Sequence, residues 1–366
     1  MLFASLTLIF ISFLRKSFAN NLNQPNHLNK IISKDWDNHF NENLKRKFQV
    51  IAGPGMEEIA SNIMKSCPER FLYHATQWDK FPDGTDKIEI GGFQPLNRIA
   101  GQDILFLCSF HSNDVTLSQF SVMITLLQSF IRSLTVVLPF YPVGTMERVI
   151  REGQVATANS YAQMFSNLPS CGCPTRLLTY DLHTLQNRFY LHNHAFASLQ
   201  TTIPLLIQQM NQIESKKKID CIAFPDDGAA KRFSDMFMKS DYEIVTCGKI
   251  RDGHKRIVNI QDGNPKGKNI VIVDDLIQTG GTLHECGLAL RAAGANSVSA
   301  FVAHAVFPDD SWKRFIEGGD RACFDRFFIT NSCPTVVKKL KESNTAIFTI
   351  LDLTQKIIED LDNFTN

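Results

Sequence analysis

The chain has 366 residues, 44% of them hydrophobic, and 38 basic against 37 acidic side chains give a formal net charge of +1. This much apolar material can fill the cores of two ordinary domains. The balanced charge argues against a protein that binds nucleic acid or an anionic membrane through its overall field. Nine cysteines without a paired spacing predict reduced, mostly buried thiols rather than a disulfide framework.

The N-terminal stretch differs in composition from the rest of the chain. Residues 2–14 are almost continuously apolar and are followed by Arg15, Lys16 and a small-residue site near Ala19. That length is typical of a signal-peptide core and is shorter than a membrane span. The Asn-rich residues 20–43 predict a disordered spacer. Three interpretations stay open: a targeting segment, an upstream start codon in the gene sequence, and a marginal membrane anchor.

From residue 48 onward, short apolar runs alternate with helical periods, as is typical of parallel sheets covered by helices. In the first half, the pattern predicts a helix over residues 56–65 and buried strands over residues 48–52, 104–110 and 134–140. In the second half, it predicts a helix over residues 204–212, strands over residues 219–224, 269–273, 298–303 and 327–330, and a last strand and helix within residues 346–361. A further helix, with Leu283, Cys286 and Leu290 on one face, should end at Gly294 in a left-handed cap.

Both halves contain the same unit, since residues 134–149 and 270–285 each run from a hydrophobic strand through a glycine-bearing turn to a helix start. This likeness suggests two related α/β domains. We expect the boundary near residues 199–202. The chain then divides into an N-terminal extension of residues 1–45, a domain of residues 46–200 and a second domain of residues 201–366.

Residues 273–282, VDDLIQTGGT, combine a strand that ends in two carboxylates with a glycine-rich turn before a helix. The amides freed by Gly280 and Gly281, together with the positive end of the helix dipole, can surround a phosphate dianion. Asp274 and Asp275 would repel that phosphate, but they are strong acceptors for the vicinal hydroxyls of a ribose ring. The pattern therefore predicts a sugar-phosphate site.

These ten residues resemble the binding motif shared by phosphoribosyltransferases and phosphoribosyl pyrophosphate (PRPP) synthetases. From about residue 48 to the C-terminus, the chain resembles the PRPP synthetases, most closely the plant-type class described as phosphate-independent. The resemblance implies an α/β protein with two related domains of type I phosphoribosyltransferase-like fold, each a parallel sheet flanked by helices. It also implies that one loop binds ribose 5-phosphate, through Asp274, Asp275, Gln278, Thr279, Gly280, Gly281 and Thr282.

The sequence Tyr180-Asp181-Leu182-His183 follows an apolar-leaning run at residues 175–179 and matches the family's strand-end motif. Two residues apart on an extended segment, Asp181 and His183 should point the same way and could share one divalent cation. The family assigns them that role, which implies Mg²⁺ as the cofactor.

Two further segments carry charges that the family uses. Asp226, in the run AFPDDGAAKR at residues 223–232, resembles the family's aspartate beside the ribose. Lys249 and Arg251 match a catalytic Lys-x-Arg pair, and two cations on one side of an extended segment could neutralise charge on the transferring group.

The expected nucleotide site draws on two segments. Phe81, Asp83 and Gly84, in FPDGT, resemble a segment that meets adenine and is supplied in the family by a neighbouring subunit. The second segment, residues 141–148, departs from the usual loop, and Glu147 and Arg148 are its candidates for ATP contact. Gln278 stands where typical synthetases have an acidic residue, which puts phosphate dependence, nucleotide inhibition and strictness for ATP in doubt.

The resemblance implies a diphosphotransferase that converts Mg-ATP and ribose 5-phosphate into PRPP and AMP. The expected partners are these two substrates and further copies of the chain in a homo-oligomer, with no nucleic acid and no stable membrane association. We expect a cytoplasmic location, with organelle targeting through the apolar N-terminal segment as the alternative.

Three rival functions stay open. A phosphoribosyltransferase would have no use for Asp181 and His183, whereas a non-catalytic regulatory subunit would not need to keep them together with Lys249 and Arg251. A secreted or membrane-tethered binding protein is suggested only by residues 2–14.

Overall fold

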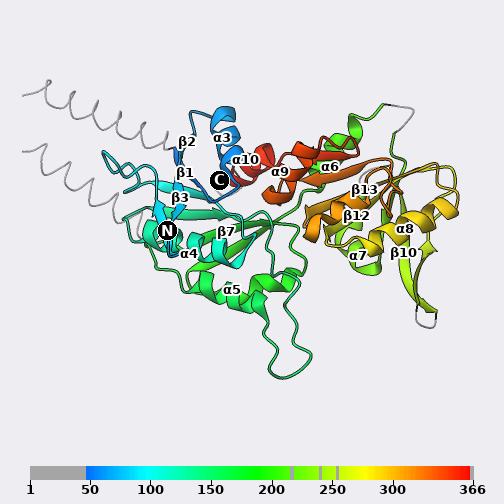
Figure 1. Ribbon diagram of the computed structural model, residues 1–366, viewed down its shortest axis with the longest axis horizontal. Coiled ribbons are helices and arrows are strands. Elements are labelled where there is room, and N and C mark those ends of the chain that lie inside the picture. Colours follow the sequence, from blue (N-terminus) through cyan, green and yellow to red (C-terminus); the bar gives the residue numbers. More distant parts are fainter. Residues whose placement is uncertain (1–46, 215–217, 239–240, 253–254, 363–366) are drawn as a thin grey trace, which may run out of the picture. The chain divides into compact units, whose positions relative to one another are not determined.

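The computed structural model describes residues 47–214, 218–238, 241–252 and 255–362, while the side chains of residues 249–257 lie outside that description. The N-terminal segment and the spacer predicted within residues 1–45 also lie outside it. Residues 47–366 form one compact unit, which contains a six-stranded and a seven-stranded sheet (Figure 1).

The six-stranded sheet lies in the first half of the chain and is parallel throughout, in the order β2-β1-β5-β6-β7-β8. Its strands are β1 (Phe48–Ala52), β2 (Phe71–His74), β5 (Asp103–Leu107), β6 (Ser133–Val137), β7 (Thr175–Tyr180) and β8 (Ala195–Gln200). Helices α3 (Glu57–Ser66), α4 (Asn113–Leu127) and α5 (Thr157–Ser166) connect them, with the short helix η1 (Leu185–Tyr190) before β8. An antiparallel hairpin of β3 (Gln77–Lys80) and β4 (Asp86–Glu89) stands apart from this sheet.

The seven-stranded sheet has the order β11-β10-β9-β12-β13-β14-β15 and is parallel except for its edge pair β10 and β11. Its strands are β9 (Cys221–Phe224), β10 (Glu243–Asp252), β11 (Lys255–Asp262), β12 (Asn269–Ile277), β13 (Ser297–Ala305), β14 (Phe327–Thr330) and β15 (Phe348–Leu351). The helices of this half are α6 (Ile203–Asn211), α7 (Asp227–Phe237), α8 (Gly281–Ala292), α9 (Pro334–Ser343) and the short η3 (Pro308–Arg314).

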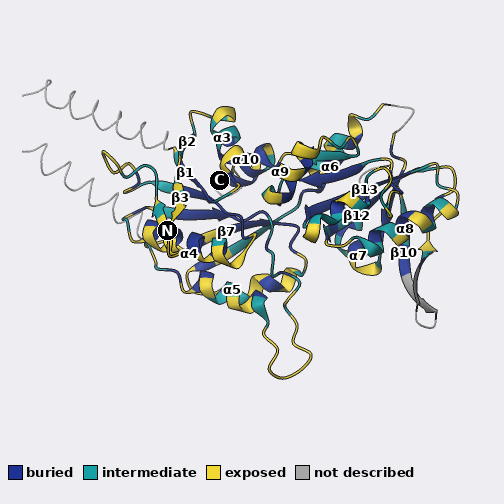
Figure 2. Cartoon of the chain, in the orientation of Figure 1, coloured by how far each residue is buried: buried dark blue, intermediate teal, exposed yellow. Residues whose placement is uncertain are grey.

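Each sheet is buried on both faces, as Figure 2 shows by the dark strands. Along β1, Val50 and Ala52 pack with α3, while Ile51 between them packs with α4 and α5. In the second sheet, Val271 and Val273 of β12 join the cluster of α6 and α7, and the alternate residues join that of α8 and α9. Helices on both faces explain why these strands are continuous apolar runs in the sequence. The predicted α/β architecture with helix-flanked parallel sheets is confirmed.

The C-terminal helix α10 (Thr354–Asp362) packs back onto the first sheet rather than onto the second. Its residues Ile357 and Leu361 lie in one core cluster with Val50 of β1. Gln355 of α10 also donates a hydrogen bond to Ser66 of α3, at 3.2 Å. The division of the chain into residues 46–200 and 201–366 stays a prediction. The sequence did not indicate that α10, from the C-terminal end, would pack on the first sheet.

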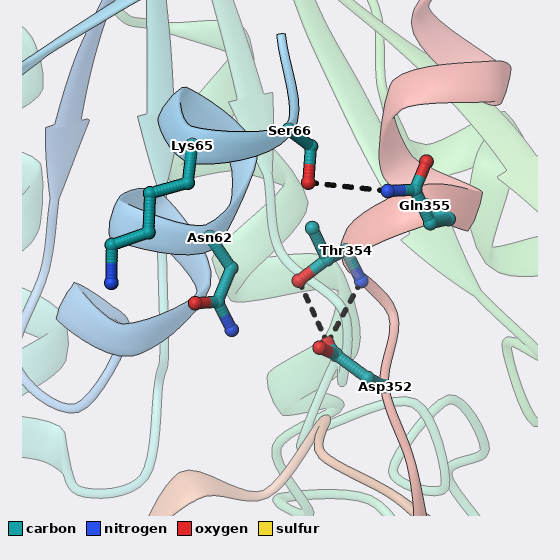
Figure 3. A pocket seen from close by; sticks show the side chains of 6 residues that line it. All are labelled: Asn62, Lys65, Ser66, Asp352, Thr354 and Gln355. Atoms are coloured by element: carbon teal, nitrogen blue, oxygen red, sulfur yellow. Dashed lines mark hydrogen bonds between the residues drawn. The ribbon is translucent and has the colours of Figure 1, made fainter. Parts of the chain in front are cut away.

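Between α3 and α10 lies a cavity of about 210 Å³ (Figure 3). It is lined by Asn62, Lys65, Ser66, Asp352, Thr354 and Gln355. No residue predicted from the sequence to bind a ligand lines this cavity, so the predicted chemistry belongs elsewhere in the molecule.

Most predicted strands and helices are present within a few residues of their expected bounds, but one local prediction is wrong. A helix start was expected at the end of residues 134–149, whereas the chain there forms a long loop and α5 begins only at Thr157. Proline at position 142 and a turn at Gly144 separate β6 from any helix, so the two halves share the strand but not the strand-turn-helix unit.

Two further observations bear on the sequence predictions. All nine cysteines are free and most are buried, as expected of reduced thiols. Among the described residues, no helix combines the length and the apolar character that crossing a bilayer requires.

Candidate active site

The predicted sugar-phosphate segment lies where β12 ends and α8 begins. Asp274 and Asp275 belong to the last residues of β12, the exposed Gln278 and Thr279 form the turn, and Gly280 caps α8. Gly280 has a left-handed φ of 75°, and a Cβ atom there would overlap the ring of Phe315, so the turn requires glycine. The first amides of a helix have no intrahelical acceptor. The start of α8 therefore presents free N–H groups next to the two aspartates.

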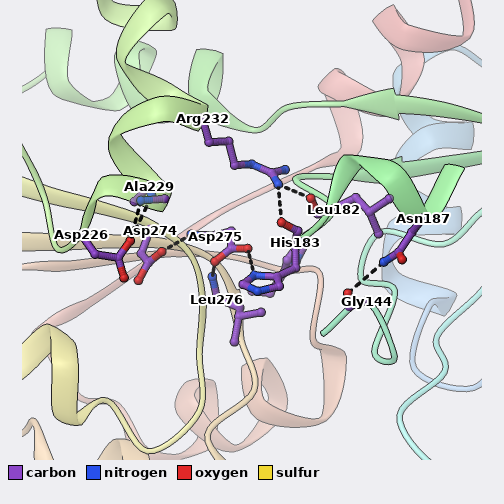
Figure 4. Close-up of polar contacts among 12 residues, drawn as sticks. Gly144, Leu182, His183, Asn187, Asp226, Ala229, Arg232, Asp274, Asp275 and Leu276 are labelled. Carbon is purple, nitrogen blue, oxygen red and sulfur yellow. Dashed lines mark hydrogen bonds and ion pairs between the residues drawn. The ribbon is translucent and has the colours of Figure 1, made fainter. Parts of the chain in front are cut away.

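Asp275 is joined to His183 by a hydrogen bond of 2.6 Å between Oδ2 and the ring Nδ1 (Figure 4). This contact connects the segment that follows β7 of the first sheet with the end of β12 of the second sheet. It brings together two residues that the sequence assigned to different ligands, the metal and the ribose.

Asp275 and His183 each shift the pKa of the other. The hydrogen bond that His183 donates to Asp275 raises the pKa of His183, and the nearby carboxylate of Glu147 adds to that effect. Burial alone would raise the pKa of Asp275, but the contact with His183 and the positive charge of Arg232 lower it. The contact between the two side chains therefore favours the charged form of each.

Asp274 lies beside Asp275, and Asp226 lies beside Asp274, as Figure 4 shows. Burial and the adjacent charge of Asp275 raise the pKa of Asp274 well above its usual range. Asp226 caps α7, because its Oδ1 accepts hydrogen bonds from the amides of Gly228 and Ala229 at 3.1 Å each. Three acidic side chains from β12 and the start of α7 thus gather at one edge of the second sheet.

Asp181 lies in a different environment from the one the sequence predicted. Strand β7 ends at Tyr180, and Asp181 has a left-handed φ of 37°, so the chain is not extended there and Asp181 and His183 do not project side by side. The Asp181 carboxylate is 1% exposed and accepts hydrogen bonds from the hydroxyl of Thr201 and from the amide of Thr202, both at 2.8 Å. The prediction that residues 181–183 form an extended segment is therefore wrong. The role of Asp181 as a metal ligand stays a prediction.

Arg232 of α7 ends the run of residues 223–232, and the sequence predicted no function for it. Its Nη1 donates to the carbonyl oxygens of Leu182 and His183. These contacts tie the backbone after β7 to the second sheet's helix and hold His183 opposite Asp275 (Figure 4).

Glu147 and Arg148 lie in the long loop between β6 and α5. The Glu147 side chain is 10% exposed, and its Oε1 meets Nε of Arg148 at 3.1 Å. The Arg148 side chain is 83% exposed. Asn187 of η1 fixes the loop by donating to the carbonyl of Gly144 at 2.8 Å. The charge of Glu147 raises the pKa of His183, so this predicted nucleotide segment lies close to the site formed by His183 and the three aspartates.

Phe81, Asp83 and Gly84 form the turn of the β3–β4 hairpin, away from that cluster. Gly84 has a φ of 86°, Asp83 accepts from Thr85, and Phe81 is 48% exposed. The hairpin is anchored to α4 and β1, for example by the indole N–H of Trp78, which donates to the carbonyl of Ala52 at 3.0 Å. The structure does not bring this turn together with His183.

The backbone of Lys249 and Arg251 is extended in β10, paired with Val258 and Arg256 of β11. The extended backbone that the sequence predicted is present, and a shared side for the two side chains stays a prediction. Their side chains lie outside the described residues.

Comparison with known proteins gives this arrangement a family. A model of the phosphoribosyl transferase domain matches residues 206–322. Ribose-phosphate pyrophosphokinase 4 of Arabidopsis thaliana is 42% identical over 320 residues, which cover 87% of this chain and 92% of that protein. The chain belongs to the ribose-phosphate pyrophosphokinase family.

A second relative supports the family assignment, and a solved structure supports the fold. The chloroplastic ribose-phosphate pyrophosphokinase 3 of Arabidopsis thaliana is 43% identical over 288 residues, 78% of this chain and 68% of that protein. The crystal structure of phosphoribosylpyrophosphate synthetase from Mycobacterium smegmatis has the same fold, with a TM-score of 0.71 at 20% identity, covering 87% of this chain and 99% of that one. The predicted type I phosphoribosyltransferase-like fold is therefore confirmed.

The donor set at the pyrophosphokinase-family site fits Mg²⁺. The described residues contain no group of three or more His, Cys, Asp or Glu side chains able to enclose a metal ion. Mg²⁺ at nucleotide sites usually takes one or two protein carboxylates and completes its shell with phosphate oxygens and water. The imidazole of His183 and the neighbouring carboxylates offer such a partial set.

Proposed function

We propose that this protein is a ribose-phosphate diphosphokinase, which transfers the β,γ-diphosphoryl group of Mg-ATP to the 1-hydroxyl of ribose 5-phosphate and releases PRPP and AMP. The single observation that carries the proposal is the 2.6 Å contact between His183 and Asp275. It joins the segment with the family's metal motif to the segment with its ribose-phosphate motif. A protein that used only one of these ligands would not need both segments in one place.

Ribose 5-phosphate is held at the end of β12 in this proposal. The amides of Gly280, Gly281 and Thr282, with the hydroxyls of Thr279 and Thr282, surround the 5-phosphate at the positive end of α8. Asp274, Asp275 and Asp226 accept hydrogen bonds from the ribose hydroxyls. Phosphate and hydroxyls are thus bound at opposite ends of one short segment, which fixes the direction in which the 1-hydroxyl points.

In this proposal the diphosphoryl group of ATP is bound between the loop that follows β7 and the loop that follows β12. Mg²⁺, when bound, would neutralise charge on the nucleotide phosphates. His183 would hold it, with Asp181 either as a second ligand or, as its contacts with Thr201 and Thr202 favour, as the residue that shapes the turn before His183. Lys249 and Arg251, whose backbone belongs to β10, are proposed to stabilise the charge that develops on the diphosphoryl group.

ATP contacts are proposed for Glu147 and Arg148 of the loop that adjoins His183. Phe81, Asp83 and Gly84 lie on the hairpin turn and are proposed to serve the adenine site of a neighbouring subunit in a homo-oligomer. Because Phe81 is exposed and its hairpin is anchored away from His183, supply of this turn to another subunit is consistent with the geometry.

The direct test is to incubate the purified protein with ribose 5-phosphate, Mg²⁺ and ATP, with and without inorganic phosphate, and to follow AMP. We expect AMP in both reactions at similar rates, as for the phosphate-independent class. Absence of AMP under both conditions would contradict the proposal and favour a regulatory subunit. Consumption of PRPP with free bases would favour a phosphoribosyltransferase instead.

We propose a cytoplasmic location, with an organelle as the alternative because one relative is named chloroplastic. Fluorescent fusions of the full chain and of a version that begins at Lys45 distinguish the two. Identical diffuse signals support the first location, and loss of organelle signal on truncation supports the second.

A further inference from the structure

The imidazole of His304 is a buried titratable group that the proposed reaction does not use directly. It lies on β13 of the second sheet, is 2% exposed, and reaches across to the first half of the chain. Its Nε2 lies 2.9 Å from the carbonyl oxygen of Tyr180, the last residue of β7, and its ring packs at a tilt against Phe140 with ring centroids 4.8 Å apart. Phe140 lies near the start of the loop that carries Glu147. His304 therefore touches the bases of two loops that meet at the candidate active site.

Hydrogen-bond chemistry fixes the tautomer of His304. A carbonyl oxygen can only accept, so Nε2 must carry a proton toward Tyr180. The other nitrogen, Nδ1, lies 2.9 Å from the hydroxyl of Ser332. The Ser332 hydroxyl also lies 3.0 Å from the carbonyl of Ala303, to which it donates, so the bond to Tyr180 is the one that assigns the proton of Nε2. Burial lowers the pKa of His304 and favours the same neutral, Nε2-protonated ring.

Tyr180 is the point at which this bond matters for the site. Its hydroxyl donates to Asp360 of α10 at 2.9 Å, and its carbonyl is held by His304, so the residue is fixed at both ends. Directly after it, Asp181 adopts a left-handed conformation, which is strained for a residue other than glycine and persists only when neighbours enforce it. The same turn then directs His183 toward Asp275.

We propose that His304 is a positioning residue of the active site: its Nε2–H bond to Tyr180 holds the turn after β7 so that His183 faces Asp275. The inference rests on the proposed function, because His183 matters only if it serves the reaction. His304 would act through His183 and would not contact the substrates. Residues that orient metal-binding side chains commonly change activity or metal affinity by about 10–100-fold when they are lost.

The test compares two substitutions that both remove the imidazole ring. In His304→Leu the donor is lost, whereas in His304→Gln the side-chain amide can place an N–H near the former Nε2. We expect H304L to lower kcat about tenfold or more with little change in KM for ribose 5-phosphate, and H304Q to recover most of that loss. A merely structural role predicts that kcat follows the thermal midpoint in both variants, without selective rescue, and this result would overturn the inference.

Tyr180→Phe serves as the matched control, since it removes the bond to Asp360 and leaves the carbonyl bond to His304 intact. We expect a lower thermal midpoint with kcat within about threefold of the wild type. A loss of kcat equal to that of H304L would assign the effect to general loosening of β7. Should H304L fail to fold, as judged by circular dichroism, His304→Asn replaces it, because its shorter amide cannot span the distance to Tyr180.

A double substitution separates this inference from the proposed function. If His304 acts through His183, adding H304L to His183→Asn should lower kcat no further, whereas independent roles would give additive losses and contradict it. Binding of Mn²⁺, followed by electron paramagnetic resonance, gives a second readout. If the wild type forms no AMP, the proposed function fails on its own. The inference then still predicts weaker Mn²⁺ binding in H304L than in H304Q, and equal binding in both would overturn it.

Discussion

Asp181 and Asp275 are two buried aspartates at the carboxyl ends of parallel strands, 1% and 6% exposed, yet their partners differ. The carboxylate of Asp181 is held by Thr201 and Thr202 at the start of α6. Asp275 instead accepts a hydrogen bond from His183, which follows β7 of the first sheet, and it lies next to a second carboxylate, Asp274. A buried carboxylate whose oxygens are satisfied by backbone and hydroxyl donors shapes the chain. A buried carboxylate that is paired with an ionisable side chain, as Asp275 is with His183, is available to bind a ligand.

The largest expected effect follows from removing the second kind of carboxylate. Asp275→Ala deletes the partner of His183 and one proposed acceptor for the ribose hydroxyls, so activity should fall by about a hundredfold or more. Binding of ribose 5-phosphate should weaken more than binding of ATP, as measured by titration calorimetry with each ligand. Weaker ATP binding with unchanged ribose 5-phosphate affinity would reverse the assignment of the two sides of the site.

His183→Asn tests the opposite side of the same contact. We expect kcat to fall about 10–100-fold and the Mg²⁺ concentration for half-maximal rate to rise, while ribose 5-phosphate affinity changes little. Rates measured across a Mg²⁺ series supply both quantities. His192→Asn is a suitable control, because this exposed histidine contacts Gln163 and lies outside the site. An unchanged Mg²⁺ dependence in the His183 variant would remove this residue from the metal site.

Much of this comparison could be predicted from the sequence, and the reasons are local. The glycine-rich turn after β12 is recognisable because its φ and its free amides require particular residue types in a fixed order. The apolar runs located most strands because both sheets are covered on both faces. The extended backbone at Lys249 and Arg251 was also predicted from the sequence.

What the sequence did not show depends on contacts between distant segments. The turn at Asp181 is left-handed because His304, Arg232 and the threonines before α6 hold it, and no motif encodes that combination. His304 stands inside an apolar strand, where a single histidine carries no signal. The packing of α10 onto the first sheet also follows from tertiary contacts alone.

Asp181→Asn tests the first kind of carboxylate. Replacing one oxygen by an amide places a donor against the Thr201 hydroxyl or the Thr202 amide, so the free energy of unfolding should drop by about 2–4 kcal/mol. Urea denaturation measures this loss. If Asp181 also holds the metal, as the family resemblance implies, the Mg²⁺ dependence of the folded variant shifts as well. A variant with wild-type stability would contradict the structural role derived from its contacts.

The smallest expected effect is a pH dependence of stability in the metal-free protein. The raised pKa of His183 means that its contribution is complete below the unfolded value of about 6.5 and is lost as pH rises through the folded value. The lowered pKa of Asp275 means that its contribution is present above about pH 3.9 and is lost as pH falls through the folded value.

The difference in thermal midpoint between the wild type and His183→Asn, with EDTA present, should therefore be greatest between about pH 4 and 6.5 and decline toward pH 8. A difference that stays constant over this range would show that the pair contributes no proton-linked stability.

The central claim is that the two sets of loops transfer a diphosphoryl group as one unit to ribose 5-phosphate. ATP labelled at the β-phosphorus tests it most directly, because the β-phosphorus leaves AMP only if the bond between the α- and β-phosphates is broken. We predict that the label appears in PRPP, in equal amounts to the AMP formed and only when ribose 5-phosphate is present. Label retained in ADP, or released as free pyrophosphate at the same rate without the sugar phosphate, would contradict the account.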